Sequence, residues 1–177
     1  ASKRSKVDKI LDLAIREAEE QFGASRHSRK ILPVKFTAGS PVADTSNPDS
    51  IEVFINIRCK TENYRAYYQL SHEAVHTLSP VSYEVVSWLE EGVATKFSHE
   101  FLARHCGINW DESGDDKYNL AWKKVTELLE FDPKAIQKIM DAFGCLSGIE
   151  PQEMCKLLPN VPERLIVELC MPFNPKA

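Results

Sequence analysis

The 177-residue sequence lacks paired cysteines, an extended basic segment and long hydrophobic runs, and each absence excludes a class of protein. Its five cysteines are an odd number with no CxxC pair, which argues against a disulfide framework and against a structural zinc ribbon. The same pattern favours a reducing compartment, so we expect a cytoplasmic protein. No apolar run approaches the length of a membrane span, and the first residues predict a charged amphipathic helix rather than a signal peptide. We therefore expect no membrane partner.

An excess of charge of one sign is also absent. The chain has 22 basic and 26 acidic residues, mixed along its length, and a net charge of -4. Its one basic cluster, residues 26–30, precedes a predicted strand and is typical of a solvated turn, because proteins that follow a phosphate backbone present several such contacts. Nucleic acid is therefore not an expected partner.

The composition is that of a globular domain, with 43% hydrophobic and 27% charged residues. The length suits one domain with a core of its own. We expect a single monomeric domain over residues 1–177. Within it, we expect an N-terminal helix and small sheet (1–60), the metal-site helices (61–131) and a helical C-terminal subdomain (132–177).

Hydrophobic periodicity and turn residues predict an α+β fold that is mostly helical. A helix is expected over 3–22, ended by Gly23, followed by two extended runs that predict a small antiparallel sheet, 31–37 and 51–57. Further helices are predicted over 61–78, 82–104, 117–130 and 133–143, with two short ones opened by Pro151 and Pro162. The sheet is expected to pack on the helix of residues 61–78.

Residues 72–76 read His-Glu-Ala-Val-His, an HExxH motif inside the predicted helix 61–78. Positions i and i+4 lie on one helix face, so His72 and His76 can bind the same ion. Glu73 lies beside the open side of that ion and can take a proton from a water whose pKa the metal lowers toward about 7. The motif alone leaves a second interpretation open, in which the histidines are ordinary surface or core residues and the glutamate is solvated.

A catalytic zinc site usually has three protein ligands and one water, so a third ligand is needed. The downstream candidates are Glu84, Glu90, Glu91, His99, Glu100 and His105. The HExxHxxGxxH pattern would require a histidine at position 82, where the chain has Ser82. A glutamate on the following helix is therefore the better candidate.

The segment WLEEGVA, residues 88–94, resembles the W-L-x-E-G-x-A segment of gluzincin metallopeptidases, notably the zinc aminopeptidases. In that family the glutamate of this segment is the third zinc ligand. The resemblance, which covers residues 64–98, implies Glu91 as the ligand and Glu90 as its variable neighbour. A helix starting near residues 82–84 would place Glu91 about 10 to 14 Å along its axis, level with the two histidines.

A second similarity concerns the tyrosine that stabilises the oxyanion. Residues 118–125 are similar to the Y-x-x-G-x-x-x-L segment of the same aminopeptidases, with Ala121 in place of the glycine, which implies Tyr118 as the hydrogen-bond donor. A phenol aimed at developing negative charge would stabilise it in a dry cleft. Tyr83, on the connection between the two metal-site helices, is an equal candidate. Ordinary core packing is the third interpretation for both residues.

The family resemblance also bears on substrate binding. In gluzincins an edge strand beside the metal-binding helix pairs with the substrate backbone, and the predicted strand 51–57 takes that place in the chain order. The sequence has no GxMEN-like segment, which binds the free amino terminus of the substrate in the aminopeptidases. Exopeptidase activity is therefore not implied.

Together the motifs predict a zincin-like fold and a zinc-dependent metallopeptidase that acts on a peptide or protein substrate. One Zn2+ would be held by His72, His76 and Glu91, with a metal-activated water as nucleophile and Glu73 as general base. Two other interpretations stay open. One is a zincin-like binding or regulatory protein with structural zinc or lost activity, and the other is an enzyme kept inactive until a terminal helical region is displaced.

Overall fold

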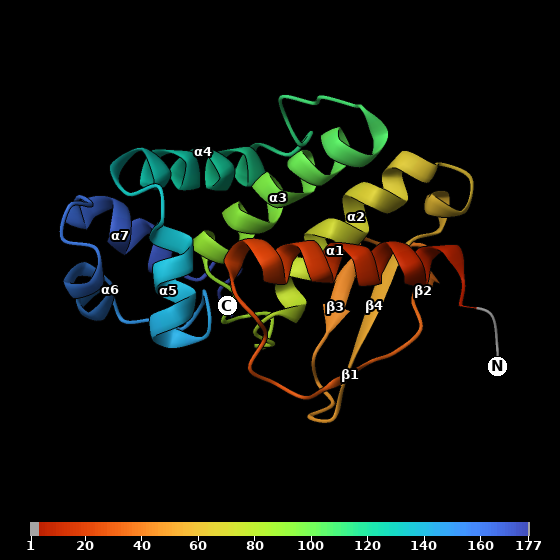
Figure 1. Ribbon diagram of the computed structural model, residues 1–177, viewed down its shortest axis with the longest axis horizontal. Helices are drawn as coiled ribbons and strands as arrows, with labels where there is room; N and C mark the ends of the chain where they lie inside the picture. Colours follow the sequence, from red (N-terminus) through yellow and green to blue (C-terminus); the bar gives the residue numbers. More distant parts are fainter. Residues whose placement is uncertain (1–3, 177) are drawn as a thin grey trace.

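A computed structural model describes residues 4–176 and shows an α+β fold that is mostly helical, as predicted (Figure 1). The described elements are α1 (Lys6–Phe22), β1 (Lys30–Ile31), β2 (Lys35–Thr37), β3 (Val42–Asp44), β4 (Ser50–Asn56), a 3-10 helix η1 (Ile57–Lys60), α2 (Asn63–Thr77), α3 (Trp88–Cys106), α4 (Asp116–Phe131), α5 (Ala135–Phe143), α6 (Pro151–Leu157) and α7 (Glu163–Cys170). The expected start of the first helix at residue 3 lies outside the described residues. None of the helices described is long and apolar enough to cross a membrane.

The sheet is mixed, so the prediction of an antiparallel sheet is wrong for the two runs that suggested it. Both β1 and β2, which come from the first run, pair with β4 in parallel, and only β3 pairs with it antiparallel. The chain crosses the end of β4 between β2 and β3, where the Asn56 side-chain amide donates a hydrogen bond to Gly39 O at 2.9 Å. This long-range crossing has no signature in the periodicity of either run.

The position of β4 also corrects the expected substrate-pairing strand. Phe54 of β4 pairs with both Lys35 of β2 and Val42 of β3, so these two strands flank β4 on opposite sides. The predicted strand 51–57 is therefore internal and cannot add a peptide at its edge. Both flanking strands, β2 and β3, lie at edges of the sheet.

The sheet and the first two helices share one hydrophobic core. Along β4, the alternate residues Ile51, Val53 and Ile55 are fully buried. They pack in the same core as Leu11 of α1 and Leu70 of α2. In Figure 1 the sheet lies at one end of the molecule, α5, α6 and α7 lie at the other end, and α2 and α3 run between them. The core thus fixes α2, the helix that carries the HExxH motif.

Helix α3 begins at Trp88, six residues later than predicted. The preceding segment is extended because it pairs with a distant part of the chain: Trp88 N donates to Met171 O at 2.9 Å, and Phe173 N donates to Val86 O at 2.8 Å. Ser87 caps the helix, since its Oγ accepts from Glu90 N at 3.1 Å. Glu91 consequently lies in the first turn of α3, and the expected displacement of 10 to 14 Å along the helix is wrong.

The glycine of the WLEEGVA segment has a packing role. A Cβ atom at Gly92 would lie 2.4 Å from the backbone oxygen of Ala121 and 2.5 Å from a methyl group of Val125. Helix α4 therefore crosses α3 at a distance that only glycine permits. This close crossing brings the first turn of α4, with Tyr118, next to the HExxH helix.

Candidate metal centre

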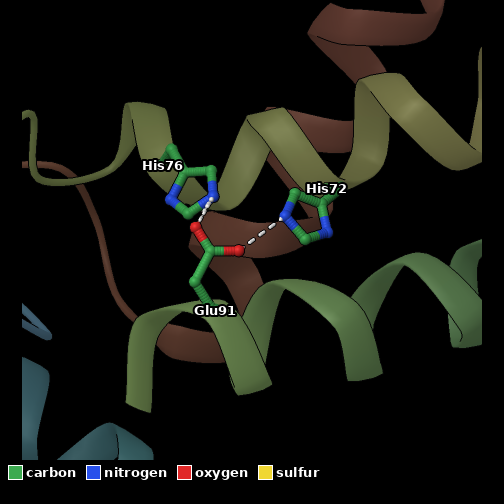
Figure 2. A group of neighbouring side chains, drawn as sticks. All are labelled: His72, His76 and Glu91. Atoms are coloured by element: carbon green, nitrogen blue, oxygen red, sulfur yellow. Dashed lines mark hydrogen bonds and ion pairs between the residues drawn. The ribbon is translucent and has the colours of Figure 1, made fainter. Parts of the chain in front are cut away.

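Helices α2 and α3 bring His72, His76 and Glu91 together (Figure 2). Glu91 Oε2 lies 3.1 Å from His72 Nε2, and Glu91 Oε1 lies 3.1 Å from His76 Nε2. One ligand atom from each residue lies within 4.8 Å of the other two. This three-residue group could hold a metal ion.

The placement follows from helix geometry and from burial. His72 and His76 are one turn apart, with ring centroids 5.1 Å from each other, and both rings face the first turn of α3. Burial opposes ionisation of Glu91, but the two histidines outweigh it and hold the pKa of this carboxyl well below its usual range. Burial likewise opposes the charged form of His76, yet Glu91 and Glu90 raise its pKa well above the ordinary value. The group is therefore a tight ionic cluster.

The donor set is that of a divalent metal site with an open position. Two imidazole nitrogens and one carboxylate oxygen are ligands that divalent transition metals accept, and three protein ligands leave room for a water or substrate. All three side chains are at most 12% exposed, so a bound ion would be largely shielded from solvent. The residues present thus fit a metal ion.

Glu90 supports this group, a role that the sequence interpretation missed. Its carboxylate is buried, with Oε2 accepting from His76 Nδ1 at 2.6 Å and Oε1 accepting from Ser147 Oγ at 2.9 Å. A carboxylate on the outer nitrogen of a histidine ligand fixes the ring orientation and directs the other nitrogen to the metal. The family resemblance assigned Glu90 as a variable neighbour. The acidic doublet and the Ser87-to-Glu90 capping pattern were the available signals.

Glu73, the predicted base, lies beside the ligands and is 5% exposed. Burial raises the pKa of its carboxyl, although the two histidines oppose this shift. The side chain lines two clefts that meet at the centre. Glu90 and Glu91 pair with histidines. Among the described residues, Glu73 is therefore the acidic group of the centre that lines both clefts without pairing with a histidine.

The two tyrosine candidates occupy different positions. The Tyr118 ring lies 5.6 Å from the His72 ring and 4.9 Å from the Phe173 ring, and it lines both clefts. Burial and then the charges of Glu91 and Glu73 raise the pKa of its phenol, so it stays protonated. Tyr83 is 62% exposed and lines only the smaller of these two clefts. Tyr118 is thus held against a ligand, whereas Tyr83 lies at the surface.

The two clefts share His72, Glu73 and Tyr118 and differ in most of their other lining residues. The larger, with a volume of about 320 Å³, runs along α2 from His72 to Arg65 and is walled by Tyr68 and Trp110. The smaller, about 80 Å³, is lined by His72, His76 and Glu91 and also by Val42 and Ala43 of β3. An edge strand of the sheet, β3, therefore lines the smaller cleft, whereas the resemblance gave that place to the strand 51–57.

The remaining ligand candidates lie away from the centre. His99 is buried, with its ring stacked on Trp122 at 4.1 Å, and burial lowers its pKa. His105 pairs with Glu17 at 2.6 Å. Glu100 pairs with Lys96, and Glu84 is exposed. These side chains do not join His72 and His76.

Comparisons of the chain with protein-family models, with curated proteins and with solved structures gave no match. The resemblance to gluzincins therefore rests on sequence motifs alone.

Proposed function

We propose that this protein is a zinc-dependent peptidase. The observation that carries the proposal is the convergence of His72, His76 and Glu91 at the junction of two clefts that Glu73 also lines. A purely structural metal site does not require a buried carboxylate such as Glu73, which lines a cleft and pairs with no histidine within residues 4–176. The order of the HExxH and WLEEGVA motifs supports the same conclusion.

One Zn2+ is the ion that we assign to the centre. Two histidines and one glutamate form a ligand set that catalytic zinc sites use, with the fourth position left for water or substrate. A bound zinc ion would lower the pKa of water and polarise the carbonyl of a peptide bond. His72, His76 and Glu91 would hold it, and Glu90 would keep the His76 ring oriented through Nδ1.

Glu73 would transfer protons, and Tyr118 would stabilise the oxyanion. The Glu73 carboxylate accepts a proton from the water that attacks the carbonyl carbon, and returns a proton to the leaving nitrogen as the C–N bond breaks. Tyr118 donates its hydroxyl hydrogen to the carbonyl oxygen as negative charge develops there, because its raised pKa keeps it protonated. Tyr83 remains a second candidate for this donor, at the mouth of the smaller cleft.

The test combines metal analysis with turnover. Purified protein should contain close to one zinc per chain and should cleave members of a peptide library in a reaction that a chelator stops. Glu73→Gln should keep the zinc but reduce turnover by about 100-fold to 10,000-fold, the usual contribution of a general base. Glu84→Gln is a matched control, because this glutamate is exposed and lies outside the three-residue group.

Each contrary result has a distinct meaning. Protein that neither contains zinc nor takes it up contradicts the metal centre. Zinc without cleavage of any peptide refutes the peptidase and favours the zincin-like binding or regulatory protein. Full turnover in Glu73→Gln removes Glu73 as the base.

A further inference from the structure

The larger cleft extends well beyond the metal centre along one face of α2. Arg65 lies seven residues before His72, which is close to two full turns, so the two side chains share a face and are separated by about 10 Å along the helix. Both line the same cleft of about 320 Å³. A peptide bound across the centre and into this cleft would therefore pass Arg65.

The end of the cleft at Arg65 carries surplus positive charge. Arg65 donates its Nε–H to Glu62, and Arg58 donates to the same carboxylate at 3.1 Å. One carboxylate thus serves two guanidinium groups. Within residues 4–176, Glu62 is the one carboxylate in contact with Arg65, and it takes only the Nε–H. The terminal nitrogens of the guanidinium fork have the geometry that binds a carboxylate ligand.

The wall between the metal centre and Arg65 is aromatic and held in place. His99 Nδ1 donates to Trp110 O at 3.0 Å, and His99 Nε2 accepts from the Tyr68 hydroxyl at 3.2 Å. The Tyr68 and Trp110 rings lie 5.5 Å apart. This part of the cleft is therefore formed before any ligand arrives and offers apolar surface for a side chain.

The larger cleft also has two acidic side chains in its lining, Glu73 at the metal centre and Asp115. Asp115 also lines the cleft, and its carboxylate accepts from Lys117 N at 2.9 Å and from Tyr118 N at 3.4 Å at the start of α4. These bonds and the positive end of the helix dipole offset its charge. Arg65 is not offset to the same degree, because it shares its only carboxylate with Arg58.

We propose that the larger cleft is a substrate subsite that selects a peptide carboxylate, with Arg65 as its partner and Tyr68 and Trp110 contacting the residue between. A separation of about 10 Å corresponds to about three residues of extended peptide, so the carboxylate belongs two to three residues from the scissile bond. The carboxylate can come from an aspartate or glutamate side chain or from the peptide's own C-terminus. This subsite deepens the proposed peptidase function and rests on it.

The test is a scan of carboxylates along peptide substrates. Aspartate or glutamate is compared with asparagine or glutamine at each of three positions on either side of the cleaved bond, and C-terminal acids are compared with amides. At one position two or three residues away, the acid should raise kcat/KM by about 10-fold, a difference near 1.4 kcal/mol. A preference confined to C-terminal acids identifies the α-carboxylate as the source, and one that persists in amidated peptides identifies the side chain.

Variants of Arg65 make the assignment specific. In Arg65→Gln, the ratio of kcat/KM for the acidic peptide to that for its amide counterpart should fall to within about two-fold of one, mainly through KM. In Arg65→Glu, lysine should become the preferred residue at the same position. Arg104→Gln is the control, because Arg104 pairs with Glu17, does not line the cleft and shares no partner with Arg65 in the described part of the chain. It should retain the preference.

Binding to Glu73→Gln separates failure of the subsite from failure of the peptidase. Affinities of acidic and amide peptides for this variant are measured by calorimetry. Cleavage without an acid preference at any position, or with a lysine preference in the wild type, overturns the subsite and leaves the peptidase standing. An Arg65-dependent acid preference in binding, with no cleavage by the wild type, supports the subsite and overturns the peptidase. Neither cleavage nor preferential binding overturns both.

Discussion

His76 on α2 is partly buried and His99 on α3 is buried, and their surroundings have opposite effects on their charge. His76 lies between the carboxylates of Glu90 and Glu91, which raise its pKa well above the ordinary value. His99 lies against the Trp122 ring and bonds a backbone oxygen and a tyrosine hydroxyl, and burial lowers its pKa. The first environment favours positive charge, and the second excludes it.

The difference separates a histidine that could bind a metal ion from a structural one. Around His76, carboxylates face both ring nitrogens, so a positive ion can replace the proton that these acids attract. Around His99, both nitrogens are already used by neutral partners, Trp110 O and the Tyr68 hydroxyl. His99 can orient the wall of a cleft, but it offers no open nitrogen to an ion.

The largest expected effect comes from removing each histidine in turn. His76→Ala should abolish stoichiometric zinc binding, because it deletes a ligand and leaves Glu90 and Glu91 without a shared partner. His99→Ala should still bind one zinc per chain. Metal content measured by mass spectrometry on both purified variants makes the comparison, and equal zinc in the two would show that the contrast is mistaken.

A smaller effect is expected from the residue that orients His76. Glu90→Gln should weaken zinc affinity by about 10-fold to 100-fold, the usual effect of changing a hydrogen-bond partner of a histidine ligand. Ser147→Ala should act in the same direction with a smaller effect, because it removes a bond to the other oxygen of Glu90.

Competition with a fluorescent chelator measures both affinities. Glu100→Gln serves as the control, since Glu100 pairs with Lys96 away from the centre. An unchanged zinc affinity in Glu90→Gln would remove its positioning role.

The smallest effect concerns the pH dependence of stability. The pKa of His99 is lowered from 6.5 in the folded protein, so the unfolded chain binds more protons below about pH 6.5. The free energy of unfolding should therefore fall as the pH falls below that value, by at most about 1.4 kcal/mol per pH unit from this residue. His99→Gln should remove this contribution.

Urea unfolding of the metal-free protein between pH 5 and 7.5 measures the slope. Parallel curves for wild type and His99→Gln would show that His99 is not held neutral.

The features that could be predicted from the sequence are those with a local period. Most helices appear where apolar residues recur every three or four positions, and α6 begins at Pro151 as expected. The facing of His72 and His76 follows from their spacing in a helix. The approach of Glu91 to them came from the motif order, and the structure brings these three residues together.

What could not be predicted depends on contacts between distant segments. The parallel pairing of β2 with β4 requires the chain to cross the end of the sheet. The late start of α3 depends on Met171 and Phe173, and the role of Glu90 depends on Ser147. These partners lie far from residues 82–91 in the sequence. Local helix propensity therefore predicted a start of α3 that is too early.

The pairing of residues 86–88 with residues 171–173 bears on when the protein becomes competent during synthesis. Phe173 is 2% exposed and packs on both Trp88 and Tyr118, so it joins the first turns of α3 and α4. His72, His76 and Glu91 are translated before residues 171–173, which pair with the start of α3. In a nascent chain the start of α3 therefore lacks this pairing until residue 173 has left the ribosome.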